Sequence, residues 1–216
     1  MEKLLCPSMM CANFEALKDE TIALDKAGTD IFHCDIMDGS FVPNMTMGVP
    51  DVTAIRKNTG KLVDCHLMVD NPSEKVQLFI DAGADIIYIH PKTEKLVNRT
   101  LSVIKEAGRM AGIAIDPDTS IESVYETFNL VDYVLVMTVN PGFAGQKYNE
   151  FVTDKIIRLI PYKEKYGFKI IIDGACSPAK IEELSKLGAD GFVLGTSAVF
   201  GKEEDYDTIF EKLRQL

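Results

Sequence analysis

Basic charge is scarce in this chain of 216 residues. Lysine and arginine together number 23 against 33 aspartates and glutamates, which gives a formal net charge of -10. A chain this acidic repels the phosphates of nucleic acid and the surface of an anionic membrane, so we expect neither as a partner. If the substrate carries a phosphate, local features of the site have to attract it.

Long apolar runs and paired-cysteine motifs are also missing. The apolar stretch at residues 4–10 is too short for a membrane span or for the core of a signal peptide. The five cysteines include no C-x-x-C pair, and their number is odd. We therefore expect reduced, mostly buried thiols in a cytoplasmic protein, and no zinc held by four cysteines.

No low-complexity, proline/serine-rich or charged segment divides the sequence. Hydrophobic residues make up 46% of the chain, which is enough for one large core. We expect a single domain over residues 1–216.

What the sequence does contain is an alternation of short apolar runs with helix-forming stretches. The apolar runs are typical of buried parallel strands, which need long crossover connections. Expected strands cover 4–9, 30–35, 62–66, 86–90, 111–115, 133–137, 169–172 and 191–194, and expected helices cover 15–26, 52–57, 73–80, 94–106, 120–128, 152–166, 178–186 and 206–213. A weak repeat at 27–30, 82–85 and 187–190 places a glycine where each helix ends before a strand.

Eight such units predict an α/β fold, the (β/α)8 TIM barrel of ribulose-phosphate-binding type. An open doubly wound sheet is the alternative, but its dinucleotide-binding pattern G-x-G-x-x-G is absent.

Several polar side chains come at the predicted strand ends, where a barrel carries its function. His33 and Asp35 share one face of the second strand, and His66 and Asp173 end the third and seventh. Each has an ordinary structural alternative, such as a core histidine or a turn aspartate, but their coincidence at one mouth favours a site. Two imidazoles and two carboxylates suit one divalent ion, Zn, Mn, Fe or Co, with Mg as the alternative.

Glycine-containing loops follow the sixth, seventh and eighth strands, at 142–145, 174–175 and 195–196. Exposed backbone N–H groups in such loops can surround an anion, and barrels often bind phosphate after strands seven and eight. These loops contain no lysine or arginine, so backbone groups would attract the phosphate despite the acidic net charge.

Six sequence blocks, in order and spacing, resemble the ribulose-phosphate 3-epimerase family over nearly the whole chain. They are P-S-M-M at 7–10, H-C-D-I-M-D-G-S-F-V-P-N at 33–44, C-H-L-M at 65–68, M-T-V-N-P-G-F-A-G-Q at 137–146, I-D-G at 172–174 and G-T-S-A-V-F at 195–200. The resemblance implies that His33, Asp35, His66 and Asp173 hold the metal and that Asp35 and Asp173 are the catalytic acid/base pair. It also implies that the substrate is contacted by Ser8, His66, Met37, Met68, Met137, Gly142, Phe143, Ala144, Gly145, Gly174, Ala175, Gly195 and Thr196.

Within the family, some positions depart from the usual pentulose form. Cys11, Ala144 and Ala175 are among them, and D-C-H-L-M, F-A-G-Q and G-T-S look more like the allulose-6-phosphate 3-epimerase branch. We therefore expect conversion of D-allulose 6-phosphate to D-fructose 6-phosphate. The alternatives are D-ribulose 5-phosphate to D-xylulose 5-phosphate, in the pentose phosphate pathway, and a non-catalytic sugar-phosphate-binding barrel. The D-x-K-x-x-D pattern of related decarboxylases is absent.

The expected chemistry is a two-base 1,1-proton transfer at C3 through an enediolate, with Asp35 and Asp173 on opposite sides of the sugar. Met37, Met68 and Met137 would exclude water from the intermediate. Methionines after the first two strands, at positions 9, 10, 45 and 47, suggest either a subunit interface or plain core filling. We expect a homo-oligomer, either a dimer or a hexamer.

Overall fold

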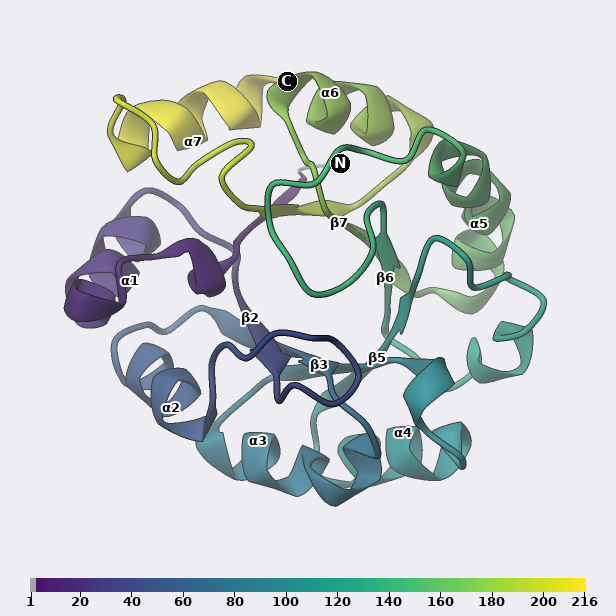
Figure 1. Cartoon of the computed structure of the whole chain (residues 1–216). Coiled ribbons are helices and arrows are strands. Elements are labelled where there is room, and N and C mark those ends of the chain that lie inside the picture. The colour runs from purple at the N-terminus through teal and green to yellow at the C-terminus, as the bar shows by residue number, and fades with distance from the viewer. Residues whose placement is uncertain (1–2) are drawn as a thin grey trace.

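The computed structural model describes residues 3–216, which form a barrel of eight parallel strands surrounded by helices (Figure 1). The strands are β1 (Leu4–Pro7), β2 (Ile31–Met37), β3 (Leu62–Met68), β4 (Ile86–Ile89), β5 (Met110–Ile115), β6 (Tyr133–Met137), β7 (Lys169–Asp173) and β8 (Gly191–Leu194). Neighbouring strands follow the order β1-β8-β7-β6-β5-β4-β3-β2. Between β1 and β2 the barrel is joined by a parallel bridge from Ser8 to His33. The expected (β/α)8 barrel is confirmed.

Among the described residues, seven α-helices cover the outside of the barrel. They are α1 (Leu17–Lys26), α2 (Val49–Lys57), α3 (Val76–Ala82), α4 (Val97–Glu106), α5 (Val152–Tyr166), α6 (Pro178–Leu187) and α7 (Tyr206–Gln215). Short 3-10 turns occupy Met9–Cys11, Phe14–Ala16, Pro72–Glu74, Pro91–Thr93 and Tyr125–Thr127.

The helix expected over 120–128 is wrong, because only the 3-10 turn Tyr125–Thr127 forms there. The Ser123 hydroxyl donates to the Ser120 carbonyl at 2.7 Å, and the Ser120 hydroxyl accepts from the Ser123 N–H at 3.2 Å. Such side-chain bonds compete with the helical pattern. The segment still buries Phe128 completely, so its apolar spacing reflects packing against the barrel rather than an α-helix.

Alternate residues of each strand point to two different cores. One set, including Cys6, Tyr88 and Leu135, fills the barrel interior, and the other, including Phe32 and Ile87, packs against the helices. Both faces of the strands are therefore buried, as the near-continuous apolar runs predict. Toward the carboxyl end of the barrel, polar side chains replace the interior apolar ones.

An aspartate immediately precedes each even-numbered strand and accepts a hydrogen bond from the backbone of the strand before it. Asp30, Asp85, Asp132 and Asp190 each accept from a backbone N–H at 2.7 to 2.9 Å, on Leu5, Val63, Ala111 and Ile170 respectively. Each aspartate also contacts a cation, as Lys163 contacts Asp190 at 2.6 Å. The sequence repeat at 27–30, 82–85 and 187–190 thus marks three of four equivalent aspartate contacts. The fourth, made by Asp132, is not preceded by the glycine that the other three share.

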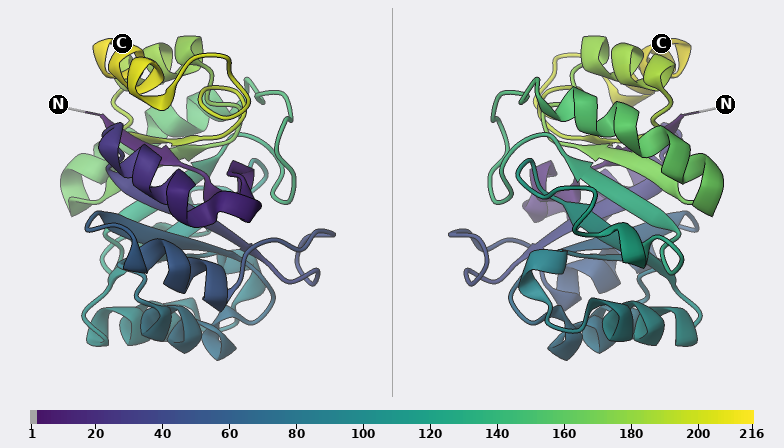
Figure 2. Two further views of the ribbon diagram at one scale, coloured as in Figure 1. Left: turned by 90° about the vertical axis from the view of Figure 1, so that its left-hand side faces the viewer. Right: turned by 90° about the vertical axis from the view of Figure 1, so that its right-hand side faces the viewer.

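Two loops project from the carboxyl end of the barrel, 38–48 after β2 and 138–151 after β6 (Figure 2). The four methionines considered as interface residues behave differently. Met9 and Met47 are buried in the core, Met10 is half-buried, and only Met45 is largely exposed, at 75%. All five cysteines are free, and four of them are buried. No helix in residues 3–216 has the length and apolarity needed to cross a membrane.

Candidate active site

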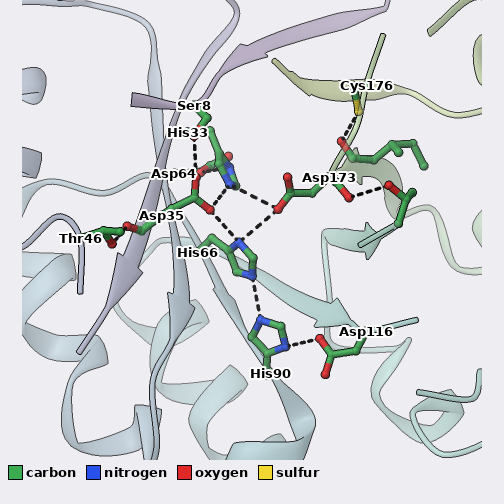
Figure 3. Close-up of polar contacts among 12 residues, drawn as sticks. Ser8, His33, Asp35, Thr46, Asp64, His66, His90, Asp116, Asp173 and Cys176 are labelled. Atoms are coloured by element: carbon green, nitrogen blue, oxygen red, sulfur yellow. Dashed lines mark hydrogen bonds and ion pairs between the residues drawn. The ribbon is translucent and has the colours of Figure 1, made fainter. Parts of the chain in front are cut away.

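Four of the predicted residues meet at the carboxyl end of the barrel interior (Figure 3). His33 and Asp35 extend from β2, His66 from β3 and Asp173 from β7. One nitrogen or oxygen of each lies within 4.8 Å of those of the others. All four are at least nine-tenths buried, so this is an interior cluster and not a surface group of acids.

Both carboxylates approach both imidazoles. Asp35 Oδ1 lies 3.1 Å from His33 Nε2 and 3.2 Å from His66 Nδ1. Asp173 Oδ2 lies 3.9 Å and 3.4 Å from the same two nitrogens. One ring nitrogen from each histidine and one oxygen from each aspartate therefore converge on a common point.

The register between β2 and β3 makes this convergence possible. Asp35 pairs with His66, and His33 pairs with Asp64. Since alternate residues of a strand share a face, the two cross-strand pairs point into the barrel one above the other. Asp64 is completely buried, and its Oδ1 lies 2.7 Å from His33 Nδ1.

The charge of Asp64 favours one position for the proton of His33, although the 2.7 Å contact is not aligned as a hydrogen bond. An ionised carboxylate only accepts hydrogen bonds, so a neutral His33 presents its N–H to Asp64 at Nδ1 and a lone pair at Nε2 toward Asp35 and Asp173. A lone pair facing carboxylates is repelled unless a cation lies between them. The four donor atoms therefore fit a divalent ion. The contact of Asp64 with the other ring nitrogen of His33 is the kind of second contact that metal-binding histidines usually make.

Electrostatics within the cluster follow the same arrangement. Burial would raise the pKa of Asp35, but the charge of His33 and hydrogen bonds from both histidines hold that pKa well below its ordinary value. Burial would lower the pKa of His33, yet Asp64 and Asp35 raise it well above the usual range. The pKa of His66 is also raised, because hydrogen bonds to Asp173 and Asp35 outweigh burial. The carboxylates thus attract positive charge, whether a proton or a metal ion.

Further hydrogen bonds fix the two aspartates. The Ser8 hydroxyl donates to Asp35 Oδ2 at 2.6 Å, and Thr46 donates to the Asp35 carbonyl at 2.5 Å. The Thr138 N–H donates to the Asp173 carbonyl at 2.7 Å. Ser8 therefore orients the Asp35 carboxylate, whereas Thr46 and Thr138 fix the backbone that carries each aspartate.

An open cavity lies above this cluster, and most of the predicted substrate-binding residues line it. They are Ser8, Met37, Met68, Met137, Gly142, Phe143, Ala144, Gly145, Gly174, Ala175, Gly195 and Thr196, together with Asp35 and Asp173. The predicted residues His33 and His66 lie behind this lining. The three methionines line the cavity and are at most 4% exposed, so they form an apolar border beside the histidines and aspartates.

The glycine loops leave backbone N–H groups available to a ligand. Within residues 3–216, the N–H groups of Phe143, Ala144 and Ala175 donate no hydrogen bond to the protein. Gly174 has φ +102, and a Cβ there would lie 2.6 Å from a methyl carbon of Val139. Ala175 also takes a left-handed conformation, with φ +50. Consecutive residues in such unusual conformations turn N–H groups toward one side, as anion sites require.

Three buried polar residues next to the cluster were not predicted from the sequence. Asp64, His90 and Asp116 are each at most 3% exposed and stand behind the two histidines of the cluster. The signal that could have identified Asp64 was present, since 64, 66 and 68 alternate on one strand face. A lone histidine after a strand, such as His90 after β4, is ordinarily a loop residue, yet His90 Nε2 lies 2.7 Å from His66 Nε2.

Comparison with known sequences identifies the family. A sequence model described as "Ribulose-phosphate 3 epimerase family" matches residues 4–200. The chain belongs to the ribulose-phosphate 3-epimerase family. The curated "Ribulose-phosphate 3-epimerase" of Aquifex aeolicus (strain VF5) is 37% identical over 216 residues, covering 99% of this chain and 96% of its own length. The protein of that name from Bacillus subtilis (strain 168) is 38% identical and covers 96% of each chain. The expected family, and an isomerase acting on carbohydrates, are confirmed.

Solved structures give the same fold at low sequence identity. A 3-hexulose-6-phosphate synthase from Salmonella typhimurium aligns with a TM-score of 0.72 at 20% identity, covering 100% of this chain and 97% of its own. A 3-keto-L-gulonate-6-phosphate decarboxylase from Vibrio cholerae gives 0.72 at 14% identity with the same coverage. At this identity the likeness concerns the barrel alone.

Proposed function

We propose that the protein is a metal-dependent ketose-phosphate 3-epimerase that interconverts D-ribulose 5-phosphate and D-xylulose 5-phosphate. The observation that carries this proposal is the pair of carboxylates, Asp35 and Asp173, which border one cavity from β2 and β7 and share two buried histidines. Inversion next to a ketone needs a base on one face of the sugar and an acid on the other.

The two aspartates divide the proton transfer. In one direction Asp35 removes the C3 proton, an enediolate forms, and Asp173 in its acid form returns a proton to the opposite face. In the reverse direction their roles exchange. Ser8 holds one oxygen of Asp35 at 2.6 Å, which orients this carboxylate toward the cavity in a single geometry.

His33, Asp35, His66 and Asp173 would hold the metal, in agreement with the fit of their donor atoms. When bound, a divalent ion supplies Lewis-acid stabilisation of negative charge that develops on the substrate oxygens. His33 and His66 act only as ligands in this scheme, and neither carries a proton to C3. Their mixed nitrogen and oxygen donors favour Zn, Mn, Fe or Co over Mg.

The rest of the cavity holds the substrate in place. Met37, Met68 and Met137 exclude water from the enediolate without offering it a proton. The loops at 142–145, 174–175 and 195–196 bind the phosphate through backbone N–H groups. This anchoring supplies attraction that the net charge of -10 cannot.

The five-carbon substrate is favoured by the relatives, whose names specify ribulose phosphate at 36 to 39% identity. D-Allulose 6-phosphate, expected from the sequence blocks, is the second candidate. The observation in its favour is that Cys11, Ala144 and Ala175, where the chain departs from the usual pentulose form, line the cavity. These three departures lie where they can contact the sugar.

Turnover of both sugars by the same preparation tests the assignment. We expect kcat/KM for D-ribulose 5-phosphate to exceed that for D-allulose 6-phosphate, and the opposite order would assign the six-carbon substrate. In D2O, the C3 position of product should carry solvent deuterium. A protein that binds both sugars without exchanging the C3 proton of either would be a non-catalytic sugar-phosphate-binding barrel.

A further inference from the structure

A second row of buried groups extends from His66 away from the cavity (Figure 3). His66 Nε2 lies 2.7 Å from His90 Nε2, and His90 Nδ1 lies 3.0 Å from Asp116 Oδ1. His90 follows β4 and Asp116 follows β5, so the row crosses three neighbouring strands. Both histidines are completely buried, and Asp116 is 3% exposed.

One arrangement of protons suits this row best when both rings are neutral. The ionised Asp116 carboxylate can only accept, so electrostatic attraction favours the His90 proton on Nδ1, although the 3.0 Å contact is not aligned as a hydrogen bond; His90 then accepts at Nε2. His66 then has to donate from Nε2. Its other nitrogen, Nδ1, is left with a lone pair, and this is the nitrogen that lies 3.2 Å from Asp35 and 3.4 Å from Asp173.

We propose that His90 and Asp116 are positioning residues that hold His66 in the tautomer with Nδ1 free for the metal ion. The proposal rests on the proposed metal site. Asp64 does for His33 in one step what Asp116 does for His66 through a second ring. The two histidines of the site thus receive their tautomers from different carboxylates, on β3 and after β5.

The surroundings of the row preserve this arrangement. The Phe41 ring lies 4.9 Å from the His90 ring, centroid to centroid, and helps to shield the His90 nitrogens from water. Lys155 donates to the carbonyls of Asp116 and Pro117 at 2.6 and 2.9 Å, which fixes the loop after β5. Lys92 contacts the outer oxygen of Asp116 at 3.2 Å. A carboxylate held in this way cannot turn away from His90.

Nitrogen NMR of the wild-type protein tests the tautomers directly. The chain has three histidines, so the ¹⁵N spectrum contains three imidazole systems to assign. We expect His90 to carry its proton on Nδ1 in the metal-free and the Zn²⁺-loaded protein, and His66 to carry its proton on Nε2 when Zn²⁺ is bound. A His90 that is protonated on Nε2 alone would overturn the proposal without any variant.

Substitution then tests the consequence for metal binding, with Zn²⁺ alone as the probe. Asp116→Asn offers an amide that can donate as well as accept, so the tautomers of both rings are no longer fixed. We expect Zn²⁺ affinity, measured by competition with a chelator, to fall by about 10- to 100-fold. Asp118→Asn is the matched control, because Asp118 also contacts Lys92 but is exposed and forms no ion pair or hydrogen bond with His66 or His90.

The outcomes separate the two proposals. Equal Zn²⁺ affinity in Asp116→Asn and wild type would overturn the positioning role, as would an equal loss in Asp118→Asn. A wild-type protein that binds no divalent ion would refute the metal site itself. The proton position on His90 would still be measured in that metal-free protein, so failure of the proposed function and failure of the row are distinguishable.

Discussion

Replacing Asp173 with asparagine tests its proposed role as a base separately from its proposed role as a metal ligand. The amide has the shape of the carboxylate and keeps an oxygen that can occupy the position of Oδ2, 3.4 Å from His66 Nδ1. Asp35 Oδ1 remains 3.2 Å from the same nitrogen. The variant therefore retains four candidate donors for the metal but has lost one of the two groups able to move a proton.

The magnitude follows from that single loss. General acid–base catalysis by one positioned side chain contributes about 10² to 10⁴ in rate, so kcat of Asp173→Asn should fall by that factor at saturating metal. Asp35→Asn should fall by at least as much, because Asp35 also binds Ser8 and both histidines.

Isotope exchange in D2O then distinguishes the two bases. One epimer presents its C3 proton to Asp35, so in Asp173→Asn that epimer should exchange C3–H for deuterium without inverting. The other epimer should neither exchange nor invert. In Asp35→Asn the two epimers should exchange their behaviour.

Two results would refute this reasoning. Asp173→Asn with most of the wild-type activity would show that a single base, or water, serves both faces. Loss of exchange in both epimers, with metal still bound, would show that Asp173 is needed to form the intermediate from either side. Metal content of each variant has to be measured alongside, so that a missing ligand is not mistaken for a missing base.

Three further predictions concern metal, fold and loop. Chelator treatment should abolish turnover and lower Tm by about 5–10 °C, since a ligand at 100 times its Kd stabilises by about 2.7 kcal/mol. Adding a divalent ion should restore both turnover and Tm, and full activity after treatment would contradict the metal role. Asp190→Ala should lower the unfolding free energy, measured by urea titration, by about 3 kcal/mol, because the buried N–H of Ile170 loses its acceptor and Lys163 loses its contact with this carboxylate. Asp190→Asn keeps an acceptor and should cost less, so equal losses would refute the backbone role. Ala175→Gly should raise the unfolding free energy by about 0.5 kcal/mol, because glycine adopts the left-handed conformation of this position without strain. The matched variant Ala144→Gly, at a position without positive φ, should lower the unfolding free energy, and a loss in both variants would contradict backbone strain at Ala175.

The barrel and the cluster of two histidines and two aspartates at its mouth could be predicted from sequence because both depend on local pattern. Apolar runs locate the strands, and residues at their ends on one face locate the mouth. His33, Asp35, His66 and Asp173 satisfy both conditions, and the structure brings all four together. The helix expected at 120–128 failed for the opposite reason, since apolar spacing records burial and does not distinguish an α-helix from a packed 3-10 turn.

The contacts of Asp64 and Asp116 behind the cluster depend on features that local pattern does not carry. The alternation of residues 64, 66 and 68 places Asp64 on the interior face of β3, but its contact with His33 also requires the register in which these two residues pair. Asp116 reaches His90 only because the end of β5 stands beside the end of β4. Neither register nor stagger is written in the spacing of residues along one strand.

The four-residue cluster and the buried residues behind it explain how the barrel interior tolerates so many ionisable groups. Four carboxylates, those of Asp35, Asp64, Asp116 and Asp173, lie at most 8% exposed, next to three histidines with no exposed surface. Buried carboxylates cost free energy unless positive charge compensates them. Lys92 compensates Asp116 from the edge, but no lysine or arginine in residues 3–216 forms an ion pair with Asp35 or Asp173. Without a metal, the positive charge beside Asp35 and Asp173 comes from His33 and His66, whose pKa values these carboxylates help to raise. In the proposed metal site, a divalent ion at the point where the oxygens converge would supply that charge instead, so it would also stabilise this end of the barrel.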